Sequence, residues 1–177
     1  AIREGGTGVE HFALRVDGEE ALESYARRLS DAGVAVVRRD GTEPGQEQAI
    51  RFAIPGGIEM ELCLVADNRY IETYRPVHNS TGIKPLDGDH INIMANDVKG
   101  LSEWLRDLLD FKFSDVILLG DDHWAASWVR MSWGHHDLGI FGTESTTETL
   151  HHVAWACSSF DHMKIAADAL AAEGIRL

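Results

Sequence analysis

Three histidines recur at matching positions in the sequence: His11, His90 and His152. Each follows a polar residue and begins an apolar, strand-like run. Alternate residues of a strand share one face, so histidines at matching positions of paired strands point to the same side of a sheet. Two neutral imidazoles and one carboxylate form a metal site that keeps coordination positions open. The recurrence therefore makes His90 and His152 candidate metal ligands.

A single histidine at the start of a strand is more often a hydrogen-bonded structural residue than a ligand. Repetition favours the metal interpretation for His90 and His152, and the alignment of the repeats selects His152 over its neighbour His151. His11, with Glu61 fifty positions later (61 − 11), also fits a ligand set. For that pair we favour a structural or vestigial role, because its sister unit would have to lie upstream, outside this sequence.

The repeats also predict where the third ligand lies. If the unit that begins at His152 continued like the first, a carboxylate would fall roughly fifty residues after His152, beyond Leu177. We therefore expect a glutamate past the end of this sequence and assign no third ligand within it.

The elements around these histidines form a β-α-β-β-β unit. Helices are predicted from an N-cap at Asp17 to Gly33, from Asp97 through Leu108, and from Ser159 or Asp161 to Gly174. The first unit adds strands at 34–38, 49–54 and 58–65, with a Pro55-Gly56-Gly57 turn, and the second adds strands at 111–119, 123–131 and 136–141. The third unit stops after its helix.

The predicted fold is α+β, built from repeated βαβββ modules. Residues 1–66 form one module of a first domain, 67–87 a linker rich in turn-forming residues, and 88–177 a second, metal-binding domain. The chain begins without Met and ends in a half-built sheet, whose edge would be unpaired. We therefore expect it to be truncated at both ends.

Composition narrows the range of partners. The net charge of −13 argues against nucleic acid, because phosphate binding needs a basic surface. No run of 18 apolar residues is present, so no membrane-spanning segment is expected. Cys63 and Cys157 lie in apolar strand-like runs, which favours two reduced thiols acting as small core residues and a cytoplasmic location.

At these residues the chain resembles the type I extradiol ring-cleavage dioxygenases of the vicinal oxygen chelate superfamily, in particular the homoprotocatechuate and catechol 2,3-dioxygenases. The resemblance runs through Asp89-His90-Ile91-Asn92, Gly134-His135-His136-Asp137-Leu138 and Leu150-His151-His152-Val153-Ala154. Those proteins have four βαβββ modules, with metal only in the C-terminal pair. The likeness implies that residues 8–65, 88–142 and 149–177 correspond to modules two, three and the start of four.

The resemblance also implies roles for single residues. His90 and His152 would bind Fe(II), with Mn(II) as the alternative metal, and Asn92 would lie beside the substrate or O2. His136 would be the acid/base group near the bound oxygen. The alternative is a structural role, in which His136 ends a strand and is hydrogen-bonded to the backbone. Trp128 would line the substrate pocket, although tryptophans on strands are more often core residues.

The implied activity is extradiol cleavage of a catechol-type aromatic ring, with insertion of both atoms of O2. The expected partners are a small aromatic diol and further copies of the chain in a homo-oligomer. Two rivals keep the fold and change the chemistry: a metal-dependent, glyoxalase-like isomerase and a non-catalytic small-molecule-binding protein. The residues above do not exclude either one, because a fold does not determine a function.

Overall fold

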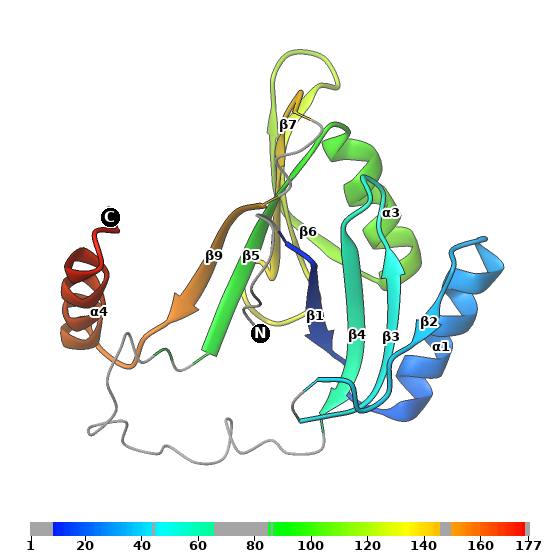
Figure 1. Cartoon of the computed structure of the whole chain (residues 1–177). Coiled ribbons are helices and arrows are strands. Elements are labelled where there is room, and N and C mark those ends of the chain that lie inside the picture. Colours follow the sequence, from blue (N-terminus) through cyan, green and yellow to red (C-terminus); the bar gives the residue numbers. More distant parts are fainter. Residues whose placement is uncertain (1–8, 44, 66–84, 86, 146–149, 176–177) are drawn as a thin grey trace. The chain divides into compact units, whose positions relative to one another are not determined.

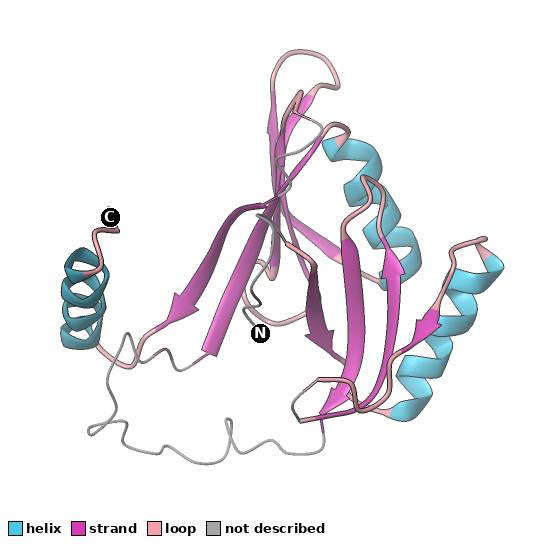
Figure 2. Cartoon of the chain, viewed as in Figure 1, coloured by secondary structure: helices cyan, strands magenta, loops and turns pink. Residues whose placement is uncertain are grey.

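The computed structural model describes residues 9–43, 45–65, 85, 87–145 and 150–175. They form two successive βαβββ arrangements and then a strand and a helix that begin a third (Figures 1 and 2). The α+β fold of repeated modules is therefore confirmed. The described residues divide into two compact units, one from 1–66 and 92–152, the other from 67–91 and 153–177. The predicted linker lies outside the described residues except for Pro85 and Asp87, and the predicted domain boundaries stay a prediction.

The first arrangement is a four-stranded sheet with one helix. Its elements are β1 (His11–Arg15), α1 (Glu19–Asp31), β2 (Val37–Arg38), β3 (Gln46–Ala53) and β4 (Glu59–Val65). The strand order is β1-β4-β3-β2, in which β1 runs parallel to β4 and the other pairs are antiparallel. Helix α1 contacts β3 and β4, as Figure 1 shows.

The core of this arrangement comes from one face of the sheet and one stripe of the helix. Its fully buried side chains are Leu22, Leu29, Ile50, Phe52, Met60 and Leu62. Burial of each contributes about 1.5–3 kcal/mol to folding. The opposite face of β1, β3 and β4 carries polar and charged residues, which are described with the site.

The second arrangement repeats the first and adds a strand. Its elements are β5 (Asp87–Ala95), α3 (Val98–Leu109), β6 (Lys112–Leu118), β7 (Trp124–Arg130) and β8 (Leu138–Gly142), followed by β9 (Leu150–Ala156) and α4 (Phe160–Ala172). The strand order is β6-β7-β8-β5-β9. Starting from β5, the order β5-β8-β7-β6 reproduces β1-β4-β3-β2, and β9 is the neighbour of β5.

Helix ends follow the predicted capping with one exception. The Asp97 side chain accepts a hydrogen bond from Gly100 N at 2.8 Å, and the Ser159 hydroxyl accepts one from His162 N at 3.2 Å. Both are therefore N-caps. The prediction of Asp17 as the first N-cap is wrong, because Gly18 holds that position without a side-chain cap. The chain leaves α1 and α4 through Gly33 and Gly174, which have the positive φ that glycine adopts without strain.

Three predicted strands differ from the structure by more than one residue. The strand expected at 49–54 is β3, which begins three residues earlier, at Gln46. The strand expected at 34–38 is reduced to β2, which pairs with β3 only at Val37 and Arg38. The strand expected to begin at His136 begins at Leu138 instead, because the Asp137 carboxylate holds the preceding residues in a turn. It accepts hydrogen bonds from Met131 N at 2.7 Å, Ser132 N at 2.8 Å and the Ser132 hydroxyl at 2.6 Å. The Pro55-Gly56-Gly57 turn is confirmed by the hydrogen bond from Gly57 N to Ile54 O.

The two arrangements pack together through their helices, α1 against α3. Arg28 of α1 donates to Leu108 O at 3.2 Å and to the Asp110 carboxylate at 2.8 Å, both at the end of α3. Burial, with the Asp110 carboxylate as a second cause, raises the pKa of Tyr25 beside them. Within the described residues, no helix has the length and apolar character needed to cross a membrane.

Candidate functional site

Strand β5 carries the first candidate ligand, His90, at its exposed end. The His90 side chain is 16% exposed, and its Nδ1 lies 2.7 Å from the Asp89 carboxylate. A histidine ligand typically donates its second ring N–H to such a group, which fixes the tautomer and the orientation of the ring. The Asp89 contact therefore favours a proton on Nδ1 and directs metal binding to Nε2.

Asn92 lies two residues further along the same strand and is buried, with 1% of its surface exposed. Within the described part of the chain its amide oxygen has no hydrogen-bond partner. Buried polar atoms are almost always paired, and one that is not calls for an explanation such as a missing ligand. Asn92 is therefore a structural indication of a binding site on this sheet.

Trp128 on β7 lies close to Asn92 in the sheet, because its pairing partner on β8 is Gly139, which contacts the Asn92 side chain. Its ring is edge-on to Phe141 at 5.7 Å between centroids and to His136 at 6.5 Å. Trp128 is half-buried rather than part of the core. A pocket-lining role fits this position.

His136 lies in the turn between β7 and β8 that Asp137 holds in place. Its Nδ1 is 2.9 Å from Nδ1 of His135, and its ring faces the edge of Trp128. His136 was predicted on a strand but lies in this turn, and from there its ring contacts Trp128.

Strand β9 carries His151 and His152 next to each other, with their ring centroids 4.9 Å apart. Exposure alternates along it: His152, Ala154 and Ala156 are less exposed than their neighbours, as period-two packing requires. The His152 Nδ1 lies 2.6 Å from the His151 Nδ1. His151 in turn packs edge-on against Phe141 at 5.0 Å between ring centroids.

A chain of ring contacts thus runs from His136 through Trp128, Phe141 and His151 to His152. It places the predicted acid/base residue and one predicted ligand in the same aromatic cluster. The other predicted ligand, His90, lies on β5, the strand next to β9 in the sheet order. Among the described residues, no three His, Cys, Asp or Glu side chains converge to hold a metal. The ligand set, with its glutamate expected past Leu177, stays a prediction.

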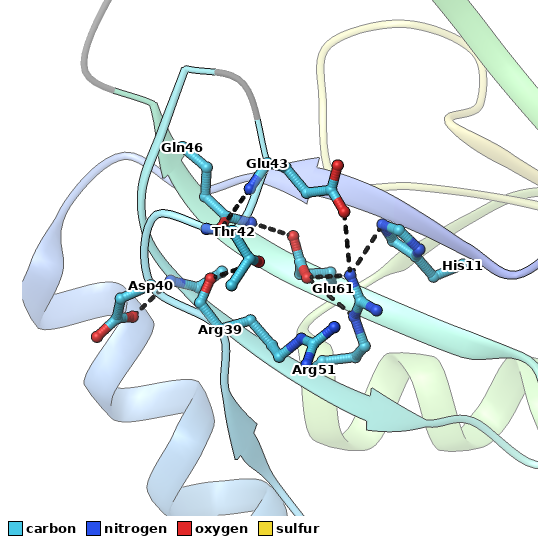
Figure 3. Close-up of polar contacts among 9 residues, drawn as sticks. His11, Arg39, Asp40, Thr42, Glu43, Gln46, Arg51 and Glu61 are labelled. Carbon is cyan, nitrogen blue, oxygen red and sulfur yellow. Dashed lines mark hydrogen bonds and ion pairs between the residues drawn. The ribbon is translucent and has the colours of Figure 1, made fainter. Parts of the chain in front are cut away.

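The polar face of the first sheet contains a second cluster, which includes His11 and Glu61 (Figure 3). Glu61 is fully buried and Arg51 is 8% exposed, and the two form an ion pair with the Arg51 Nη2 2.9 Å from Glu61 Oε2. The His11 Nε2 lies 3.0 Å from the same Arg51 Nη2. This arrangement agrees with the structural role favoured for His11 and Glu61.

Several residues that form these clusters were not identified from the sequence. Gly139, Phe141 and Asp137 surround the predicted site residues, and Arg51 joins His11 to Glu61. Arg51 had a usable signal, because it lies on the strand paired with that of Glu61 and is one of few charged residues in an apolar run. Gly139 and Phe141 depend on contacts between separate strands, whereas Asp137 accepts hydrogen bonds from Met131 and Ser132, which lie six and five positions before it.

Cys63 and Cys157 are both free thiols. Cys63 is buried, as expected for a core residue, whereas Cys157 is only half-buried. Burial is the main cause that raises the pKa of Cys63 to about 11, with the Glu61 charge second. A thiol with such a pKa is a poor nucleophile at neutral pH.

Known proteins share this fold. A manganese-dependent 2,3-dihydroxybiphenyl 1,2-dioxygenase from Geobacillus genomosp. 3 is 29% identical, over 92% of this chain and 54% of its own. A homoprotocatechuate 2,3-dioxygenase from Arthrobacter globiformis superposes with a TM-score of 0.78 at 23% identity, over 98% of this chain and 53% of its own. A Mn(II)-bound glyoxalase from Novosphingobium aromaticivorans superposes with a TM-score of 0.69 at 24% identity. The match covers 93% of this chain and 52% of the glyoxalase chain.

The chain therefore spans about half the length of these relatives. Residues 88–177, half of the chain, match the family described as the Glyoxalase/Bleomycin resistance protein/Dioxygenase superfamily. These are the residues that carry β5 to α4 and all the predicted site residues. The chain belongs to the Glyoxalase/Bleomycin resistance protein/Dioxygenase superfamily.

Proposed function

We propose that this chain forms part of an extradiol dioxygenase, which opens a catechol-type ring and inserts both atoms of O2. The observation that carries the proposal is the buried Asn92, whose amide oxygen has no partner in the described part of the chain. Gly139 on β8 separates it from Trp128, and His90 is two residues away on β5, so a polar ligand on this face would supply the missing hydrogen bond. The 29% identical relative is named as a dioxygenase of an aromatic diol.

His90 and His152 are the residues that would hold a divalent metal, with a glutamate from outside this sequence as third ligand. Their chemistry fits, because each Nδ1 contacts a neighbouring side chain and Nε2 faces away from that contact. A divalent metal held by these residues would supply open coordination positions for a catechol and for O2. Fe(II) is the metal proposed from the sequence, and the name of the Geobacillus relative supports Mn(II) as the alternative.

The remaining residues act on the substrate itself. Trp128 and Phe141 offer aromatic edges that exclude water from one side of a planar ring. Asn92 offers an amide to a polar group of the substrate or to O2. His136, which is held against Trp128, exchanges a proton with the reacting oxygen, a role that suits imidazole because its pKa lies near neutral pH.

The test uses the product of the complete gene, because this chain spans about half of its relatives. The protein loaded with Fe(II) or Mn(II) is mixed with catechols that carry different substituents, and O2 uptake is measured together with absorbance of a yellow ring-opened product. Uptake that is matched by product formation supports the proposal. Metal-loaded protein that consumes no O2 with any catechol contradicts it.

A glyoxalase-like isomerase is the second candidate, and the fold shared with the Mn(II)-bound glyoxalase of Novosphingobium aromaticivorans favours it over other rivals. An isomerase would convert a thiol adduct of an aldehyde without consuming O2. The O2 electrode therefore separates the two candidates in one measurement.

Two further properties belong to the proposal. We expect the complete protein to form a homo-oligomer, which size-exclusion chromatography with light scattering tests. We also expect a cytoplasmic location, which would keep Cys63 and Cys157 reduced.

A further inference from the structure

The polar cluster of the first sheet is arranged around one nitrogen atom of Arg51. Three groups approach Arg51 Nη2: Glu61 Oε2 at 2.9 Å, His11 Nε2 at 3.0 Å and Glu43 Oε1 at 3.9 Å. They come from β4, β1 and the loop before β3, as Figure 3 shows. An imidazole nitrogen and carboxylate oxygens that surround one positive point form the donor set of a divalent transition metal.

The chemistry of arginine determines which partner donates in the hydrogen bond between Arg51 and His11. A guanidinium only donates hydrogen bonds and stays charged at any ordinary pH. His11 Nε2 must therefore accept, with its lone pair directed at the positive charge. This is the form in which a histidine binds a metal.

The Glu61 carboxylate is held in place by a contact that does not involve Arg51. Glu61 is fully buried, and its second oxygen, Oε1, accepts a hydrogen bond from the Gln46 amide. The Gln46 amide oxygen in turn accepts from Thr42 N at 2.9 Å. Glu61 is also the strand-pairing partner of Ala13, two residues from His11 on the same face of β1. The site is thus preorganised for a cation.

The second sheet differs at the equivalent positions. His11 corresponds to His90 in the repeat, so Ala13 corresponds to Asn92. In the first sheet Ala13 pairs with Glu61, and Glu61 pairs with Arg51 on the next strand. In the second sheet Asn92 lies against Gly139, and Gly139 pairs with Trp128 on the next strand. A glycine and a tryptophan thus stand where the first sheet has its carboxylate and its guanidinium. The second sheet therefore has no guanidinium at the position equivalent to Arg51.

We propose that the Arg51 guanidinium occupies a divalent-cation site of the first sheet and keeps metal out of it. Removal of the guanidinium will expose a second metal site, with His11 and Glu61 as protein ligands and Glu43 within reach. This site belongs to a sheet that the proposed dioxygenase chemistry does not use.

The experiment starts from the chain with His90→Ala and His152→Ala, so that the predicted catalytic ligands cannot contribute. Arg51→Ala is added to this background, and Co(II) is the probe, because its visible absorption reports histidine and carboxylate ligation. Two controls accompany it: Arg51→Lys, which retains a positive charge, and Arg51→Ala with Glu61→Gln, which removes the carboxylate.

We expect the Arg51→Ala chain to bind Co(II) in a one-to-one ratio at least about tenfold more tightly than the background and the Arg51→Lys chain, a difference of one decade in Kd. Its melting temperature will rise with Co(II), and the added Glu61→Gln change will abolish both effects. Equal binding by the background and the Arg51→Ala chain overturns the proposal. Failure of the Arg51→Ala chain to fold in excess Co(II) also overturns it, because a metal in the place of the guanidinium would neutralise Glu61.

Discussion

Gly139 lies so close to Asn92 that no side chain fits between them: a Cβ added at Gly139 would fall 2.2 Å from Asn92 Nδ2. This contact brings the backbone of β8 against the one buried amide of β5 whose oxygen is unpaired in the described part of the chain. The position of the Asn92 amide therefore depends on the absence of a side chain at Gly139.

Gly139→Ala should displace Asn92 and weaken the binding of substrate. We expect a loss of about 1–3 kcal/mol in unfolding free energy, typical of overpacking, together with a higher KM for the catechol. Chemical denaturation and steady-state kinetics measure the two effects. Gly88→Ala is the matched control, because a Cβ there meets nothing within 4 Å. Unchanged KM in the Gly139→Ala protein would show that Asn92 does not contact substrate.

His136→Phe should slow turnover and leave the metal in place. The phenyl ring preserves the edge contact with Trp128 but cannot transfer a proton. General acid/base groups contribute typically 10²–10⁴-fold, so we expect kcat to fall by about that factor. Metal content by mass spectrometry and kcat are measured for this protein and for His135→Phe, whose kcat should change little. Loss of metal from His136→Phe would mean that His136 is a ligand instead.

Asp137→Asn should act through His136, because the Asp137 carboxylate accepts three hydrogen bonds that form the turn preceding β8. An amide has one acceptor atom and loses part of this network, at a cost of about 1–3 kcal/mol. We expect a lower kcat with metal content unchanged. Asp121→Asn, in the turn between β6 and β7, is the control. If kcat is unaffected while stability falls, the turn does not position the catalytic group.

The free energy of unfolding should decrease as the pH rises above neutral, because the Cys63 thiol ionises less readily in the folded protein than in the unfolded chain. Its pKa is raised to about 11 in the folded state, above the value of about 8.5 for a free thiol. Above pH 8.5 the unfolded state loses the thiol proton while the folded state keeps it, so unfolding becomes more favourable as pH rises towards 11. Denaturation curves at pH 8 and pH 10 should differ less for Cys63→Ala than for the native protein. An identical pH dependence would show that Cys63 ionises as readily in the folded state.

The sequence predicted what depends on local pattern. The three histidine-led strands, the alternating exposure along β9 and the caps at Asp97 and Ser159 follow from short-range spacing, and the structure agrees with them. The start of β8 was predicted wrongly, because the Asp137 side chain competes for the backbone N–H groups that a longer hairpin would use.

Contacts between distant segments were beyond prediction from one sequence. Arg51 meets His11 forty positions away, and Gly139 meets Asn92 across neighbouring strands. Neither contact leaves a periodic signal, since each depends on the register in which two strands pair. The repeat predicts where the ligands lie, and the pairing of the strands shows which residues surround the predicted positions.

The most direct test is a crystal structure of the complete gene product loaded with Mn(II), in which anomalous scattering locates the metal. The proposed function predicts one Mn(II) bound by Nε2 of both His90 and His152, at about 2 Å from each, as in other histidine–metal sites. It also predicts that His151→Ala keeps this metal and that His152→Ala loses it. A metal bound elsewhere, or His90 and His152 too far apart to share one ion, would contradict it.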